Sequence, residues 1–104
     1  MKIITKIAIV FMFIVLNANA DGQKVFKDYC WGCHHQTAQA FGPSFKQIAT
    51  QRTKEQIITH IAAPKSDYKD LGYKRSVMPS FGTTLNKEEL EQIVQFIYSC
   101  KDMK

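Results

Sequence analysis

Two cysteines and a histidine lie within five consecutive residues, Cys30-Trp31-Gly32-Cys33-His34. This spacing is the attachment signature of a c-type haem. Residues three apart share one side of a helical turn, so both thiols can face one edge of a porphyrin and add across its two vinyl groups. The motif therefore predicts one covalently attached haem c, with Cys30 and Cys33 as thioethers and His34 as a ligand of the iron.

Three other interpretations of the motif stay open at this point. A Cys-x-x-Cys pair also occurs in thioredoxin-like redox sites, which need a strand, a turn and a helix around it. Cys30, Cys33, His34 and His35 are potential zinc ligands, although structural zinc sites usually split their ligands into two separated pairs. A structural disulfide across so short a loop would add little stability. The histidine directly after the second cysteine favours haem over all three.

The first twenty residues have the pattern of an export signal. Lys2 and Lys6 precede an unbroken apolar run over residues 7–16, and small residues end the segment at Ala20. The run of ten residues is too short to cross a bilayer as a helix, which disfavours a membrane anchor. We therefore expect a signal peptide over residues 1–20, one domain over residues 21–104, and a periplasmic protein without stable membrane insertion.

Length and charge narrow the class of protein further. The chain has 104 residues, which excludes a multidomain enzyme or a repeat array. After residue 20 it carries twelve Lys and Arg residues against nine Asp and Glu residues. This excess is too small and too dispersed for nucleic acid, but it suits transient docking on an acidic protein surface. A domain of this size often needs a disulfide, a metal or a cofactor to complete its core.

Helices and loops must position the motif, because no segment alternates as a strand would. We expect helices over residues 22–31, over residues 53–63 and from Asn86 onward. Capping-box signatures open the second and third helices, with Gln56 and Glu89 at the third helical positions. The second helix should stop at Pro64 and precede an irregular turn over residues 68–73. Residues 32–52 are expected to be loops, broken at Gly42-Pro43.

From residue 21 onward the chain resembles a class I cytochrome c. In that family a methionine ligand lies well downstream of the attachment motif, in a Met-Pro loop that Met78 and Pro79 match. The resemblance implies that Met78 is the second axial ligand of the haem iron, opposite His34. It also implies that the carbonyl of Pro43 accepts the proton of the ligand imidazole.

The resemblance also implies the fold. Gly22 and Phe26 match the family's positions at the crossing of its terminal helices, and Ile93, Phe96 and Ile97 resemble the partner face. The expected fold is therefore all-α: the N- and C-terminal helices cross, while loops and short helices wrap around one covalent haem.

As a function, the resemblance implies a monomeric carrier of single electrons rather than an enzyme. Its partners would be a quinol-oxidising complex upstream and an oxidase, peroxidase or nitrogen-oxide reductase downstream, each with an acidic docking surface. Two alternatives stay open: a haem subunit of a larger periplasmic oxidoreductase, and a haem sensor or enzyme with a labile sixth ligand. His35 and His60 are the other candidates for that ligand. Cys100 is expected to be buried at the end of the last helix.

Overall fold

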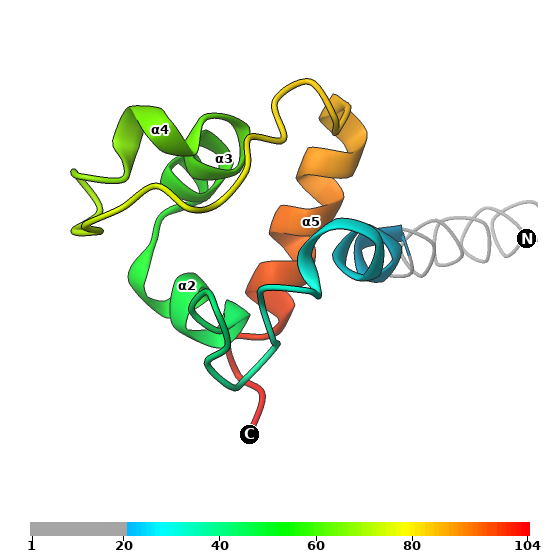
Figure 1. Cartoon of the computed structure of the whole chain (residues 1–104). Helices are drawn as coiled ribbons and strands as arrows, with labels where there is room; N and C mark the ends of the chain where they lie inside the picture. Colours follow the sequence, from blue (N-terminus) through cyan, green and yellow to red (C-terminus); the bar gives the residue numbers. More distant parts are fainter. Residues whose placement is uncertain (1–20) are drawn as a thin grey trace, which may run out of the picture.

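Residues 21–104 are described by a computed structural model and fold into helices and connecting loops (Figure 1). In chain order the elements are η1 (Phe26–Cys30), α2 (Phe45–Gln51), α3 (Lys54–Ala62), α4 (Pro64–Asp67) and α5 (Lys87–Ser99). An α-helical segment, residues 21–25, leads into η1, and no β-strand occurs in the part of the chain described. The all-α prediction is confirmed. The expected signal peptide, residues 1–20, lies outside the described residues.

The capping signatures read from the sequence are present at both longer helices. The Thr53 side chain accepts the Gln56 backbone N–H at 3.2 Å, and the Gln56 side chain accepts the Thr53 N–H at 2.9 Å. At α5 the same exchange joins Asn86 and Glu89, at 2.8 and 3.1 Å. Two otherwise unpaired N–H groups are thus satisfied at each helix start, which fixes where α3 and α5 begin.

The expectation of loops throughout residues 32–52 is wrong for α2. Ser44 caps this helix by accepting the Gln47 N–H at 3.1 Å, and Phe45 and Ala49 are buried on its inner face. A Ser followed three residues later by Gln is itself a helix-start signature, so the sequence did contain the signal. Pro64 also does more than end α3, because it occupies the first turn of α4, where its missing N–H costs nothing.

The N-terminal helix crosses α5 at Gly22 (Figure 1). A Cβ at Gly22 would lie 2.6 Å from the Gln92 carbonyl oxygen and 3.1 Å from Cβ of Phe96. Phe26 then stacks on Phe96 with ring centres 5.1 Å apart. The helix crossing implied by the family resemblance is therefore present, and a glycine permits it because the two backbones touch.

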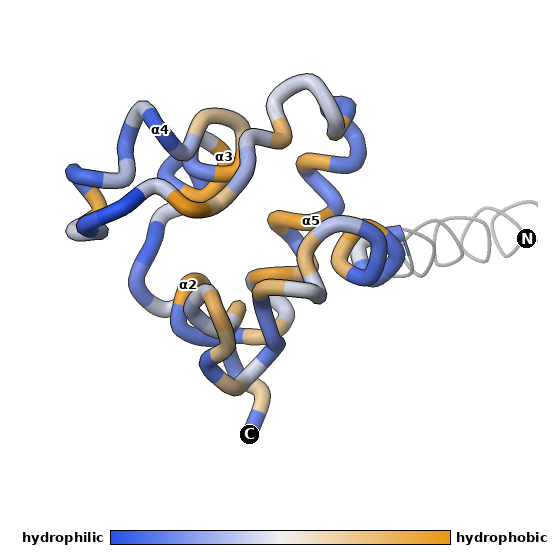
Figure 2. The backbone as a smooth tube through the Cα atoms, in the orientation of Figure 1, coloured by the Kyte–Doolittle hydropathy of each residue, from blue (hydrophilic) through white to orange (hydrophobic). Residues whose placement is uncertain are grey.

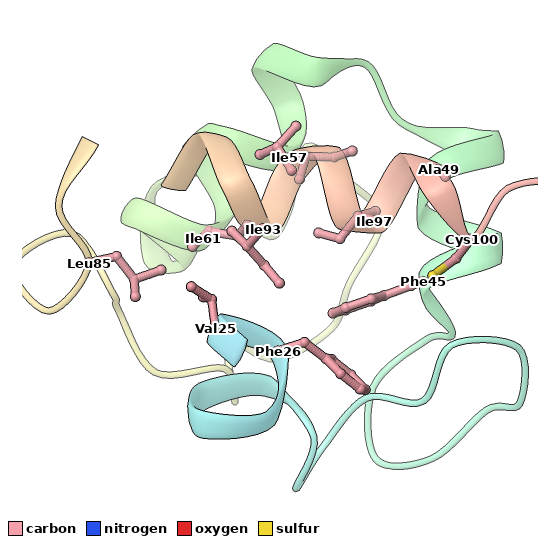
Figure 3. Packing of buried hydrophobic residues seen from close by; sticks show 11 residues of the cluster. Val25, Phe26, Phe45, Ala49, Ile57, Ile61, Leu85, Ile93, Ile97 and Cys100 are labelled. Atoms are coloured by element: carbon pink, nitrogen blue, oxygen red, sulfur yellow. The ribbon is translucent and has the colours of Figure 1, made fainter. Parts of the chain in front are cut away.

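The buried apolar side chains come mainly from the N-terminal helix, α2, α3 and α5, and they gather between these elements (Figure 3). They include Val25, Phe45, Ile57, Ile93 and Ile97. In Figure 2 apolar segments of α5 border this interior, whereas the loop after α4 is mostly hydrophilic at its far end and hydrophobic where it passes α3. No helix within residues 21–104 is long and apolar enough to cross a membrane.

Candidate haem site

The attachment motif forms a tight turn at the C-terminal end of η1. The N–H groups of Cys33 and His34 both donate to the carbonyl of Cys30, at 3.1 and 2.9 Å. Both cysteines are free thiols that line one cavity, Cys30 half-buried and Cys33 exposed. The two cysteines therefore border the same space, as attachment to a single porphyrin edge requires.

The environment of Cys30 argues against two of the alternative interpretations. Burial, with a smaller effect of the neighbouring Cys33, raises the pKa of Cys30 to about 11. A thioredoxin-like pair depends on the opposite, a thiol pKa lowered to roughly 7 or below. In addition, no three Asp, Glu, Cys or His residues within residues 21–104 are grouped to hold a metal ion. The geometry thus favours neither a redox-active dithiol nor a zinc site.

The ring of His34 is oriented by the loop that follows it. Its Nδ1 lies 2.7 Å from the carbonyl oxygen of Pro43. A carbonyl can only accept, so Nδ1 carries the proton and Nε2 keeps its lone pair. Burial lowers the pKa of His34 below its ordinary value, which leaves the ring neutral at neutral pH. The expected hydrogen bond to Pro43 is present, and Nε2 is the nitrogen available to an iron.

A cavity of about 310 Å³ lies beside the attachment motif. Its wall is largely apolar and is formed by side chains of α2, α3 and α5 together with the loops that follow the attachment motif and α4. The same wall contains Cys30, Cys33, His34 and Met78. The fold therefore brings the two expected iron ligands to one space, although 44 residues separate them along the chain.

Polar groups of the cavity wall fit the rest of a haem, whose ring is apolar and whose edge carries two carboxylates. The hydroxyl of Ser76 is buried and has no hydrogen-bond partner among the described residues. Arg52 and Arg75 line the same cavity. A buried hydroxyl without a partner is costly, and a carboxylate oxygen would satisfy it. The residues present therefore fit a haem, with Ser76 and the two arginines as the groups that can meet its carboxylates.

Met78 lies in the loop between α4 and α5. This loop is attached to the end of α3. The Phe81 N–H donates to a carbonyl of α3 at 3.0 Å, and the Ser80 hydroxyl donates to the carbonyl of Ala62. Gly82 approaches that carbonyl so closely that a Cβ would lie 2.8 Å from its oxygen. Met78 itself packs against the core. These contacts hold the loop that contains Met78 against the end of α3, beside the cavity.

Comparison with known families agrees with this geometry. The family described as cytochrome C oxidase, cbb3-type, subunit III has a model that matches residues 17–97. The chain belongs to this family. Residues 17–97 therefore form a class I monohaem cytochrome c domain, which implies covalent haem c and electron transfer. No curated protein and no solved structure matches the chain.

Two other histidines of this cytochrome c domain were candidates for the sixth ligand. His35 is exposed, and its Nδ1 accepts the N–H groups of Thr37 and Ala38, both at 3.1 Å. His60 lines the cavity, but its Nδ1 lies 2.7 Å from a carboxylate oxygen of Asp67 in α4. His35 is thus engaged in its own loop, and one nitrogen of His60 is already bound.

Sequence reasoning missed three residues of the cytochrome's site: Arg52, Ser76 and Gly82. Arg52 follows α2, donates to the Leu71 carbonyl at 2.7 Å and lies 5.7 Å from the ring centre of Tyr73. Recognising the Ser44 cap would have placed this arginine at a helix end. Ser76 and Gly82 carry no such local signal, since their roles arise from contacts with distant parts of the chain.

Proposed function

We propose that this protein is an exported, periplasmic monohaem c-type cytochrome that carries single electrons between respiratory redox proteins. The main support is that Cys30, Cys33, His34 and Met78 all line one largely apolar cavity. When bound, a haem supplies reversible one-electron chemistry. His34, through Nε2, and Met78, through its sulfur, would hold the haem iron and would leave it no position for a substrate, so the proposal is a carrier and not an enzyme.

The two proposed ligands influence the redox equilibrium in opposite directions. The hydrogen bond from His34 to the Pro43 carbonyl makes the imidazole a stronger electron donor, which favours the oxidised iron. The thioether of Met78 favours the reduced iron relative to a second imidazole. Because the Met78 loop is attached to α3, the protein holds this weak ligand in place without help from the iron.

Docking of partners is proposed at the mouth of the cavity. Phe41 and Val77 line the cavity, yet they are 93% and 81% exposed. Exposed apolar side chains that gather at one opening and have polar neighbours are typical of an interaction site. The exposed Lys74 and Arg75 lie three and two positions before Val77 in the chain and add positive charge. We therefore propose partners with acidic docking surfaces: a quinol-oxidising complex upstream, and an oxidase, peroxidase or nitrogen-oxide reductase downstream.

Export to the periplasm rests on the sequence of residues 1–20. Its basic start, apolar run and small residues at the end fit a cleaved signal peptide. The mature protein would then begin at Asp21, the first described residue. Sequencing the N-terminus of the protein recovered from the soluble periplasmic fraction tests this. An intact N-terminus in membranes washed with salt would contradict it.

The carrier function is tested on the mature protein, purified from a host that attaches haem. Electron transfer to a redox protein with an acidic surface should slow as salt concentration rises, because opposite charges steer the encounter. Lys74→Glu should slow it further, whereas Lys101→Glu, at the exposed end of α5, serves as the matched control. Rapid carbon monoxide binding by the reduced wild type at neutral pH would contradict the carrier and favour a sensor or enzyme.

A second candidate function follows from the family description. Its name refers to a subunit of an oxidase, so this cytochrome could be a fixed haem subunit of a larger periplasmic oxidoreductase. Gentle extraction from the native host, followed by size separation with detection of haem, distinguishes the two. A free carrier elutes at the size of one or two chains, whereas a fixed subunit elutes with its complex.

A further inference from the structure

The backbone of Gly42 lies against the ring of His34. A Cβ built at Gly42 would be 2.4 Å from Cε1, 2.8 Å from Nδ1 and 2.9 Å from Nε2 of that imidazole. All three distances are shorter than any side-chain carbon tolerates. The conflict thus involves the whole ring edge that contains both nitrogens. Among the glycines of the described residues, Gly42 is the one whose missing side chain would collide with a proposed iron ligand.

The loop at Gly42 is fixed to the attachment motif. The Gly42 N–H donates to the carbonyl of Cys33 at 2.8 Å, and the Phe45 N–H donates to the carbonyl of His35 at 2.9 Å. Phe45 is 2% exposed, so it anchors the far end of this loop in the core. A bulkier residue at position 42 therefore cannot be accommodated by a free movement of the loop. The ring of His34 must shift instead.

Three neighbours together define the orientation of the His34 ring. The Pro43 carbonyl holds Nδ1 at 2.7 Å, the Phe45 ring lies 5.4 Å away between centres, and Gly42 closes the remaining side. Building on the proposed function, we propose that Gly42 is a positioning residue that fixes the rotation of the His34 imidazole and directs Nε2 toward the haem iron. Pro43 thus determines which nitrogen of the ring carries the proton, and Gly42 determines the rotation angle of the ring.

The proposal has a direct electronic consequence. A Cβ at position 42 would push the ring away from the Gly42-Pro43 backbone and so lengthen the hydrogen bond from Nδ1 to Pro43. A weaker hydrogen bond makes the imidazole a poorer electron donor. The oxidised iron loses more stabilisation than the reduced iron, so the reduced form becomes more populated at a fixed ambient potential.

The test compares two glycine-to-alanine variants of the full haem-loaded protein. In Gly42→Ala the new Cβ overlaps with the ring of His34. Gly22→Ala carries an overlap of similar severity at the helix crossing, where a Cβ would lie 2.6 Å from the Gln92 carbonyl oxygen. For each variant we would measure covalent haem, the ratio of reduced to oxidised protein at fixed potential, and the denaturant midpoint.

We expect Gly42→Ala to keep its covalent haem and to raise the reduced-to-oxidised ratio by about threefold or more. Gly22→Ala should lower the denaturant midpoint and leave the ratio unchanged. A wild-type ratio in Gly42→Ala, with haem attached, would overturn the positioning role. A wild type that carries no haem would instead overturn the proposed function, so the two failures are distinguishable.

A measurement on the wild type covers the case in which Gly42→Ala does not accumulate. Nuclear magnetic resonance of the haem-loaded protein should show one set of His34 ring signals and slow exchange of the Nδ1 proton with water. Two ring orientations, or rapid exchange of that proton, would overturn the proposal because the ring would then not be fixed.

Discussion

The two sides of the proposed haem site are held by contacts of very different range. On the His34 side, the turn at Cys30 and the hydrogen bonds of Gly42 and Pro43 join residues within thirteen positions of one another. On the Met78 side, the loop is held by α3 instead. The Ser80 hydroxyl, for example, reaches the carbonyl of Ala62, which lies 18 positions earlier.

The range of these contacts indicates which side of the site should open first. The His34 side needs a short stretch of chain to be ordered, and its two thioethers would fasten it to the haem. The Met78 side needs α3 to be in place, since Phe81 and Ser80 attach the loop to carbonyl groups at the end of that helix. Low-stability openings occur where few local contacts hold a segment. We therefore expect the Met78 side to detach at lower cost than the His34 side.

The largest expected effect is loss of the His34 side altogether. Replacing both Cys30 and Cys33 by Ala removes the two attachment points and should leave no haem on the chain in a denaturing gel. Without the haem, the apolar side chains that line the cavity lose a packing partner, so the protein should also fail to accumulate. Mass spectrometry of the exported chain provides the measurement, and Cys100→Ala is the control that should keep one haem. Haem retained without either motif cysteine would contradict the attachment.

A smaller effect is expected when the Met78 side is broken. Met78→Ala removes the thioether but leaves the covalent haem, so potential should change more than folding. The oxidised protein should lose the weak long-wavelength sulfur-to-iron absorption band. The potential should fall, and the reduced protein should bind carbon monoxide. Absorption spectra and redox titration check these outcomes.

Two further variants of the same loop sharpen this experiment. Met78→His should restore six-coordinate iron at a potential below that of the wild type, because imidazole favours the oxidised state more than a thioether does. Val77→Ala is the matched control, since its side chain is exposed and should leave the absorption spectrum unchanged. A wild type without the sulfur-to-iron band would show that Met78 is not the ligand and would reopen the case for His60.

The range of the contacts also explains what the sequence could predict. The attachment motif and both capping boxes depend on residues close together in the chain and were predictable, whereas the Pro43 hydrogen bond was expected only from the family resemblance. The crossing at Gly22 is long-range, yet the family resemblance supplied it. Patterns of this kind can be read because their physical causes lie within a few residues or within a known motif.

The features that were not predicted have causes elsewhere in the chain. Gly82 matters because the carbonyl of Ala62 lies against it, and no property of residues 79–85 indicates that neighbour. The unpartnered hydroxyl of Ser76 is a feature of the folded cavity wall. The missed helix α2 differs from both, because Ser44 and Gln47 gave a local signal within a stretch otherwise rich in loop-forming residues.

An intermediate effect on the Met78 side is expected at Gly82. Gly82→Ala places a Cβ 2.8 Å from the Ala62 carbonyl oxygen, so the loop must move away from α3. Overpacking of this kind costs about 1–3 kcal/mol of unfolding free energy. The reduced variant should also bind carbon monoxide faster than the wild type, because the displaced loop holds Met78 less firmly. Urea denaturation and flash-photolysis rebinding measure the two effects.

Gly32→Ala is the matched control for that variant, because its Cβ meets no atom within 4 Å. It should keep both the stability and the rebinding rate of the wild type. If Gly82→Ala lowered stability without changing carbon monoxide binding, the loop contact would support folding alone, and the contrast between the two sides would be weaker.

The smallest effect is expected at Cys100, which supports the His34 side indirectly, through aromatic rings of the core. Cys100 is fully buried at the end of α5, and its sulfur lies 3.4 Å from the carbonyl oxygen of Phe96, whose ring packs on Phe26 and Phe45. Cys100→Ala leaves a small void and should cost about 1 kcal/mol at neutral pH. Haem attachment and potential should not change.

The same cysteine gives a pH test of its burial. Burial raises the pKa of Cys100 above its ordinary value of 9.0, so the folded protein keeps the thiol protonated when the unfolded chain begins to ionise it. Ionisation above about pH 9 therefore favours the unfolded chain, and this contribution to stability is present below that pH and lost above it. The wild type should lose stability between pH 8 and about pH 10 more steeply than Cys100→Ala. The native thiol should also resist alkylation until the protein is denatured. Rapid alkylation of the native protein, or a dimer that reductant dissolves, would place Cys100 at the surface and remove it from the support of the His34 side.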